Sequence, residues 1–162
     1  MSEPSVIHDT FVVERSYPVP PSRVFDAFSD PAKKRRWFAE GGAHEIEAYQ
    51  LDFRPGGAER GRYRFKPGTP IAGMVITNDI VFLEIVPDRR IIMAQTMILG
   101  EAPMSFALIT VELLAAGEGG TDLVCTHQAA FFEGSDGPQM RRDGWRDLFE
   151  RLGGELGRQA HG

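Results

Sequence analysis

The fold is decided by a stretch late in the chain, residues 137–157, which runs GPQMRRDGWRDLFERLGGELG. Its large apolar residues recur at intervals of three and four, the spacing that places side chains on one face of an α-helix. They are Trp145, Leu148, Phe149, Leu152 and Leu156. Asp136 and Pro138 are typical of a helix start, as a cap and a first-turn proline. We therefore expect one amphipathic helix that needs an apolar surface to lie on.

The opposite face of this helix is expected to be polar and solvated. It would carry Arg141, Arg142, Asp143, Arg146, Asp147, Glu150 and Arg151. Burying the apolar stripe contributes roughly 1.5 to 3 kcal/mol per large side chain. The rest of the chain must therefore supply the surface that covers the stripe.

Composition favours one globular domain over residues 1–162, because 42% hydrophobic and 25% charged residues are ordinary for such proteins. The net charge of −5 argues against a nucleic-acid surface. A single cysteine, Cys125, cannot form an intramolecular disulfide, and residues 1–5 lack the features of a signal peptide. No apolar run approaches the ~20 residues of a membrane span. We expect a cytoplasmic protein without a membrane span.

The first part of the chain combines a strand with two short helices. Residues 10–17 are rich in β-branched and aromatic side chains, which favours a strand that the following prolines end. Ser22 is expected to cap a short helix that ends at Asp30, and a second short helix is expected at residues 33–38. The four consecutive cations at 33–36 are interpreted as a solvated helix face.

The middle of the chain has the period of two that is typical of strands. At residues 58–66 cationic side chains alternate with Gly61, Tyr63 and Phe65, which predicts one cationic and one aromatic face. Further strands are expected at 44–53, 72–86, 90–98, 104–114 and 121–131, separated by turns rich in Gly and Pro. Short turns between strands predict an antiparallel meander. A curved sheet of this kind would grip the long helix and leave a cavity between them.

Several motifs carry a resemblance to a known family. They are the run VPPSRVFDAFSDP at 19–31 followed by Trp37 and Phe38, VPDRRI at 86–91, GGTDL at 119–123, and Gly144-Trp145 with Leu148 and Leu152. In this order they resemble the START-like (SRPBCC) helix-grip superfamily, and more narrowly the family named after the activator of the heat-shock-protein-90 ATPase. The resemblance covers residues 10–157.

The resemblance implies an α+β helix-grip fold in which a curved antiparallel sheet of about six or seven strands wraps a long C-terminal helix, with two short helices after the first strand. Members of the superfamily include lipid carriers, hormone receptors and polyketide cyclases. The favoured function is therefore binding of a small hydrophobic ligand, such as a lipid, without catalysis or cofactor. One alternative is a cyclase- or hydrolase-type enzyme that uses the same pocket, and another is a chaperone ATPase-activator-like interaction module.

Residues with catalytic chemistry are few. His127 is the candidate general base, although a buried histidine satisfied by a hydrogen bond is the simpler interpretation. Cys125 is expected to be a core residue, since an apolar strand would raise its pKa. The remaining histidines form no cluster with the spacing of metal ligands, so no metal site is predicted.

Aromatic and flexible side chains from every expected wall of the sheet–helix gap are the candidate ligand-binding residues. They are Phe28, Trp37, Phe53, Tyr63, Phe65, Met93, Gln95, Met97, Ile109, His127, Trp145 and Phe149. The alternative for each residue is that it fills the core.

A second apolar surface is expected on the outer side of the sheet. Its members would be Ile80, Phe82, Val86, Phe106 and Leu108. Exposed apolar residues on a sheet need covering, which suggests a subunit interface and hence a homodimer. The alternative is that a β-bulge shifts the register and turns some of these side chains inward.

Overall fold

The computed structural model describes residues 5–160. The strands are β1 (Ile7–Tyr17), β2 (His44–Leu51), β3 (Ala58–Phe65), β4 (Val75–Val86), β5 (Arg90–Leu99), β6 (Ala102–Ala116) and β7 (Gly120–Phe131). The helices are α1 (Pro21–Ser29), α2 (Pro31–Lys34), a π-helical turn η1 (Arg35–Ala39) and α3 (Gly137–Ala160). The predicted order of elements is confirmed.

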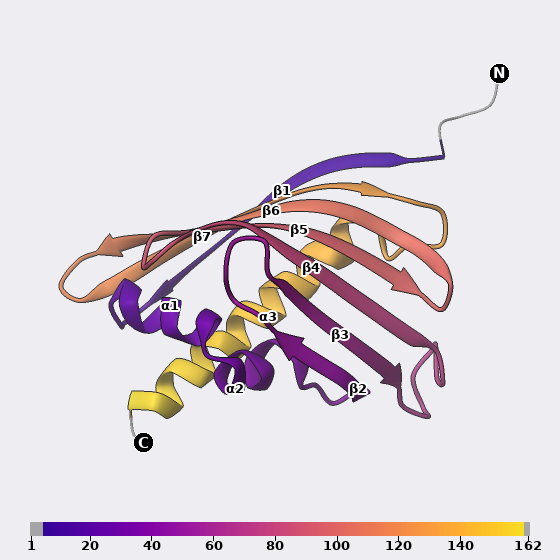
Figure 1. Cartoon of the computed structure of the whole chain (residues 1–162), viewed down its shortest axis with the longest axis horizontal. Coiled ribbons are helices and arrows are strands. Elements are labelled where there is room, and N and C mark those ends of the chain that lie inside the picture. Colours follow the sequence, from indigo (N-terminus) through magenta and orange to yellow (C-terminus); the bar gives the residue numbers. More distant parts are fainter. Residues whose placement is uncertain (1–4, 161–162) are drawn as a thin grey trace.

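All seven strands form one antiparallel sheet in the order β1-β7-β6-β5-β4-β3-β2. The first strand pairs with the last, and α1, α2 and η1 carry the chain from that edge of the sheet to the opposite one. Figure 1 shows α3 lying across one face of the curved sheet, with α1 and α2 beside its C-terminal half. The α+β helix-grip architecture expected from the sequence is confirmed.

The apolar stripe of α3 forms the centre of the core. Trp145, Phe149, Leu152 and Leu156 are buried, and Leu148 packs against them. The buried hydroxyl of Tyr17 in β1 donates a hydrogen bond to the Phe149 carbonyl over 2.8 Å, which ties the edge strand to the helix. The helix therefore packs as its spacing predicts.

Three register shifts bend the sheet around the helix. They lie between Ile46 and Ala48 in β2, between Phe82 and Glu84 in β4, and between Met97 and Ile98 in β5. Each places two residues of one strand opposite one of its partner, which increases local twist and curvature. The concave face thus created covers α3.

The burial of side chains in β4 corrects the expected outer surface. Ile80 and Phe82 are buried in the core instead of facing outward. The exposed apolar residues of this strand are Val81 and Leu83, which alternate with Ile80 and Phe82. Val86, beyond the bulge, is half-buried. A bulge is present at Leu83, but it lies beyond Ile80 and Phe82, so the expected facing of these two residues is wrong without it.

The outer surface keeps the other expected members. Phe106 and Leu108 in β6 are exposed, and Leu108 lies opposite Ala94, which in turn lies opposite Val81. We call Val81, Leu83, Phe106 and Leu108 the outer patch.

One expected helix cap is wrong. Helix α1 begins at Pro21, with Pro20 in the capping position and no side-chain cap, so Ser22 lies inside the first turn. Proline at the first helical position has the backbone angle that a helix requires, which moves the start ahead of the serine. Asp136 immediately precedes α3 and Pro138 lies in its first turn, as expected, and the Asp136 carboxylate accepts hydrogen bonds from Arg141. Asp30 does cap α2, accepting from the amides of Ala32 and Lys33.

The expected solvated face at 33–36 is wrong for Lys34, which is 1% exposed. Its ammonium donates to both carboxylate oxygens of Glu59 in β3, at 2.8 and 3.0 Å, and the Tyr49 hydroxyl of β2 donates to the same carboxylate. The ammonium also lies 4.1 Å from the centre of the Phe38 ring. Burial lowers the pKa of Lys34, and the charge of Glu59 opposes that shift. We call Lys34, Glu59 and Tyr49 the Lys34 cluster.

Candidate functional site: a pocket between the sheet and helix α3

A pocket of about 220 Å³ lies between β3, β4, β5, η1 and the first half of α3. Its apolar lining is Phe38, Ala39, Met97, Met140, Trp145 and Leu148, and its polar lining is His44, Tyr63, Asn78, Gln95, Asp136 and Arg141. Gly144 and Met140 also line it and are exposed, so the pocket opens to solvent near the start of α3.

The volume limits what the pocket could hold. It exceeds the roughly 150 Å³ of an engineered apolar cavity that binds benzene. It is below the ~300–1,000 Å³ that is typical of sites for drug-sized ligands. A small ring system with one or two substituents therefore matches the space.

The sheet wall of the pocket depends on one glycine. Gly61 is buried in β3, and a Cβ atom built there would lie 2.0 Å from the Tyr63 hydroxyl. The missing side chain therefore makes room for the Tyr63 ring over the sheet. His44 packs against that ring with 4.9 Å between centroids, and its Nε2 lies 2.7 Å from the Ala39 carbonyl oxygen. These contacts join β2, β3 and η1 at one side of the pocket.

The helix wall carries a buried ion pair. Arg141 donates through Nε and Nη2 to the two carboxylate oxygens of Asp136, each at 2.8 Å. Its guanidinium lies 5.1 Å from the centre of the Phe131 ring, and the residue is 5% exposed. The third nitrogen, Nη1, is buried without a hydrogen-bond partner in the part of the chain that the structure describes.

The facing strands add a pair of amides. Gln95 is 4% exposed and donates from Nε2 to the side-chain oxygen Oδ1 of Asn78 over 2.9 Å. The Gln95 Oε1 atom is buried and has no partner among residues 5–160. Together with Arg141 and Asp136 these residues form what we call the Arg141 cluster. It brings unpaired donor and acceptor groups to the wall of one pocket.

His127 does not line this pocket. Its ring is fully buried, stacks on Phe11 at 4.4 Å and lies edge-on to Trp145 at 6.2 Å. Neither ring nitrogen has a hydrogen-bond partner within the described residues, so the expectation of a hydrogen-bonded histidine is wrong. Burial, with a smaller effect from the positive charge of Arg141, lowers the pKa of His127 to about 4. The ring is therefore uncharged at neutral pH.

The structure separates the candidate ligand-binding residues into two groups. Tyr63, Gln95, Met97 and Trp145 line the pocket. The others pack elsewhere: Phe28, Trp37, Met93, Ile109, His127 and Phe149 are buried in the core, while Phe53 and Phe65 are half-buried. Most of the expected gap is thus filled by side chains, and the pocket occupies the end of it near the start of α3.

Sequence reasoning missed several lining residues for identifiable reasons. Arg141 precedes Trp145 by four positions, so helical spacing places it on the buried stripe and not on the solvated face where it was expected. Asn78 shares the parity of Ile80 and would have been found with the correct face for β4. His44 carries no signal in the sequence, because its position depends on how β2 meets η1.

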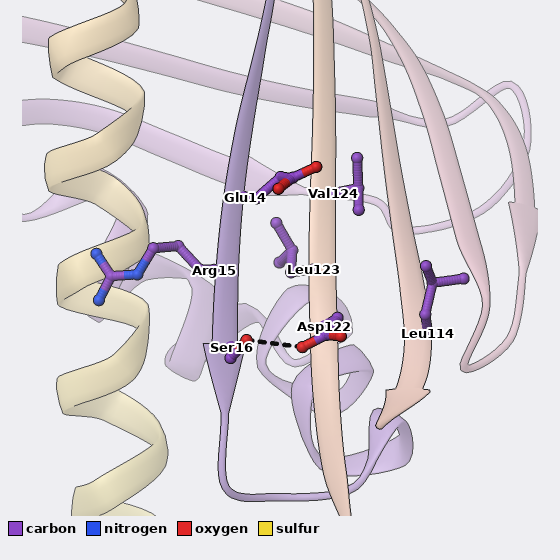
Figure 2. Close-up of a pocket in the computed structure, with 7 residues that line it drawn as sticks. All are labelled: Glu14, Arg15, Ser16, Leu114, Asp122, Leu123 and Val124. Carbon is purple, nitrogen blue, oxygen red and sulfur yellow. Dashed lines mark hydrogen bonds between the residues drawn. The ribbon is translucent and has the colours of Figure 1, made fainter. Parts of the chain in front are cut away.

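A larger hollow of about 540 Å³ lies at β1, β6 and β7. Figure 2 shows that a hydrogen bond of 2.7 Å from Ser16 to Asp122 bridges β1 and β7, while Arg15 points toward α3 and Leu114 stands apart on β6. None of its lining residues is among the described buried groups that lack a hydrogen bond. The pocket at Arg141 is therefore the better candidate site.

Other reactive groups are unsuited to chemistry. Cys125 is buried in the core, and burial raises the pKa of its thiol to about 12. Within residues 5–160, histidine, cysteine and acidic side chains form no group of three or more that could hold a metal ion. No helix in the same range is long and apolar enough to cross a membrane.

Comparisons with known proteins place the chain in a family. Residues 18–157 match the profile described as Activator of Hsp90 ATPase homolog 1-like protein. A solved structure, the Mll3558 protein from Rhizobium loti, is 44% identical, with a TM-score of 0.82 over 93% of this chain and 99% of that one. An uncharacterised protein from Rhizobium leguminosarum is 40% identical, with a TM-score of 0.85 over 95% and 97% of the two chains.

A more distant structure has the same fold. Protein CV1439 from Chromobacterium violaceum is 25% identical, with a TM-score of 0.71 over 91% of this chain and 96% of that one. No curated protein matches the chain. The profile covers most of the residues that form the sheet and α3. The chain therefore belongs to the Activator of Hsp90 ATPase homolog 1-like family, within the START-like superfamily.

Proposed function

We propose that this protein binds a small, largely apolar molecule in the pocket between the sheet and α3. The observation that carries the proposal is the volume of about 220 Å³ that side chains leave unfilled beside Trp145 and Phe38. Aromatic and aliphatic walls with a few polar groups are typical of small-molecule sites. The ligand gains the free energy of burying its apolar surface, and the pocket is already formed.

Neither alternative function has a comparable observation behind it. A general base needs an orienting partner and a path to its substrate. His127 is stacked between rings outside the pocket lining and lacks an orienting partner in the described chain. The chaperone-linked alternative rests on the description of the family alone. Binding without catalysis is therefore the function that the geometry supports best.

Two glycines of α3 provide a matched test. Gly144 lines the pocket and Gly154 does not, and a Cβ built at either position has no atom within 4 Å to meet. Phenylalanine is tolerated at both by the backbone, and replacing a helical glycine removes a penalty of up to about 1 kcal/mol. Gly144→Phe narrows the pocket mouth, whereas Gly154→Phe leaves the pocket unchanged.

The probe is isopropenylnaphthalene, an apolar two-ring compound, and the readout is the melting temperature with increasing probe. We expect a rise that follows mass action in the wild type and in Gly154→Phe, and at least a tenfold weaker apparent affinity in Gly144→Phe. Equal affinity in both variants would show that the compound binds elsewhere. No rise in the wild type would count against a pocket for small apolar ring compounds.

The outer patch supports a homodimer as a second expectation. A two-fold partner would present the same apolar residues, so Val81, Leu83, Phe106 and Leu108 would face their own copies. Sedimentation velocity of the wild type and of Leu83→Glu tests this: a dimer should become a monomer, and a wild-type monomer contradicts the proposal. The single cysteine, which is free and buried, supports a cytoplasmic location.

A further inference from the structure

We infer that the ligand of this pocket carries a neutral carbonyl oxygen, which accepts a hydrogen bond from Nη1 of Arg141. The inference rests on the proposed function and specifies the chemistry of the same site. The ligand class is a small ring compound with a ketone, aldehyde, amide or quinone oxygen at one end.

Nη1 of Arg141 lacks a hydrogen-bond acceptor in the described chain. A guanidinium has only donors, so whatever pairs with Nη1 must be an acceptor. A buried polar group without a partner costs about 1–3 kcal/mol. Nη1 is such a group, on a side chain that is 5% exposed and lines the pocket. A bound acceptor removes this cost.

The charge on this wall of the pocket determines whether the ligand's acceptor is neutral or ionised. Asp136 already neutralises Arg141 through two hydrogen bonds of 2.8 Å. A carboxylate ligand would therefore add an uncompensated negative charge beside Trp145, Phe38 and Leu148, and the desolvation of such a charge costs several kcal/mol. His127, uncharged at neutral pH, supplies no compensating positive charge. A neutral acceptor meets the need for a partner without this cost.

The opposite wall of the pocket carries a second unpaired polar group, on Gln95. Gln95 presents a buried Oε1 without a partner while its Nε2 is held by Asn78. An amide side chain offers both a donor and an acceptor, so this group accommodates a second polar substituent without selecting its kind. Arg141 therefore decides the polar end of the ligand, and Gln95 accommodates a hydroxyl where one is present.

Three probes of the same shape separate these effects: acetylnaphthalene, isopropenylnaphthalene and naphthoate, substituted at the same ring position. They place a neutral carbonyl, a hydrocarbon and a carboxylate at one point. In the wild type at pH 7 we expect acetylnaphthalene to bind about tenfold tighter than isopropenylnaphthalene, because hydrogen bonds to charged groups are worth about 1.5–3 kcal/mol. Naphthoate should be the weakest of the three. Dissociation constants come from titration calorimetry.

Two variants test the role of the ion pair. Asp136→Asn leaves Arg141 with an unneutralised charge, so naphthoate should gain at least tenfold and overtake acetylnaphthalene. Asp136→Asn combined with Arg141→Met removes both charges together and should abolish the preference for acetylnaphthalene over isopropenylnaphthalene. Circular dichroism melts establish that each variant is folded. If the double variant does not fold, the wild type and Asp136→Asn still decide.

The outcomes distinguish this inference from the proposed function. Equal binding of acetylnaphthalene and isopropenylnaphthalene to the wild type would overturn the inference and leave the pocket proposal standing. Tighter binding of naphthoate to the wild type would also overturn it, because the charge argument would be wrong. If none of the three probes binds, the pocket proposal itself is wrong.

Discussion

The two buried polar clusters have similar chemistry and different consequences. In each, a cation is paired with a carboxylate and lies over an aromatic ring: Lys34 with Glu59 over Phe38, and Arg141 with Asp136 over Phe131. In the Lys34 cluster the carboxylate accepts from both the ammonium and the Tyr49 hydroxyl, and the described groups are paired.

The Arg141 cluster, in contrast, contains polar groups without hydrogen-bond partners. Nη1 of Arg141 and Oε1 of Gln95 have no partner in the described chain, and both residues line the pocket. A cluster whose polar groups are all hydrogen-bonded to one another stabilises one folded structure. A cluster that leaves polar groups unpaired beside a pocket is suited to binding a ligand. The difference predicts that the loss of a polar side chain destabilises the fold strongly in the Lys34 cluster and little in the Arg141 cluster.

The largest effect is expected from Lys34→Met, which keeps an unbranched side chain one atom shorter and removes its charge. Glu59 would then be buried without a cation, and breaking a buried pair costs about 3–5 kcal/mol. We expect the free energy of unfolding, measured by urea denaturation, to fall by that amount. The double variant Lys34→Met with Glu59→Leu should recover most of the loss, because no charge is left unpaired. A small effect of the single variant would show that the cluster contributes little to the fold.

A smaller effect is expected from the protonation of His127, which lies beside the Arg141 cluster. The folded pKa is about 4, whereas the ordinary value is 6.5. Between these values the unfolded chain binds more protons than the folded one, so the free energy of unfolding rises with pH. Lowering the pH from 7 to 5 should remove about 2 kcal/mol.

The control for this prediction is His127→Phe, which keeps a ring against Phe11 and cannot titrate. Carboxylates contribute to the pH dependence of both proteins, so the difference between wild type and variant isolates the histidine. Asp136 opposes the lowered pKa and Arg141 supports it. Parallel pH profiles for the two proteins would contradict the prediction and show that the histidine gains a partner when protonated.

The contrast between the clusters also explains what the sequence could predict. Helical spacing and strand alternation are local, and they located the stripe at Trp145 and the two faces of β3 correctly. Charge predicts that the side chains of Lys34 and Arg141 are exposed to solvent. However, Lys34 precedes Trp37 by three positions and Arg141 precedes Trp145 by four. Helical spacing alone therefore places both residues on the buried faces of their helices, which is correct. The general preference of charged residues for the surface leads to the opposite prediction.

Other features depend on contacts between distant segments. The partner of Lys34 is Glu59, which sequence patterns do not connect to it, and the bulge at Leu83 arises from pairing with β5. The pocket itself is what remains after Phe28, Trp37, Met93 and Phe149 fill the rest of the gap. The residues that line a remaining space follow from packing in three dimensions, so the sequence identified the walls of the gap and not its unfilled end.

The smallest effect on stability is expected from Gln95→Met, which replaces a buried polar side chain with methionine, as Lys34→Met does. The Oε1 atom has no partner to lose, and Asn78 is half-buried, so its amide can turn toward water. Replacing an unsatisfied buried polar group with an apolar one of similar shape is close to neutral or stabilising. The free energy of unfolding without ligand should therefore change by less than about 1 kcal/mol. A loss as large as that of Lys34→Met would make Gln95 a structural residue and remove the distinction between the clusters.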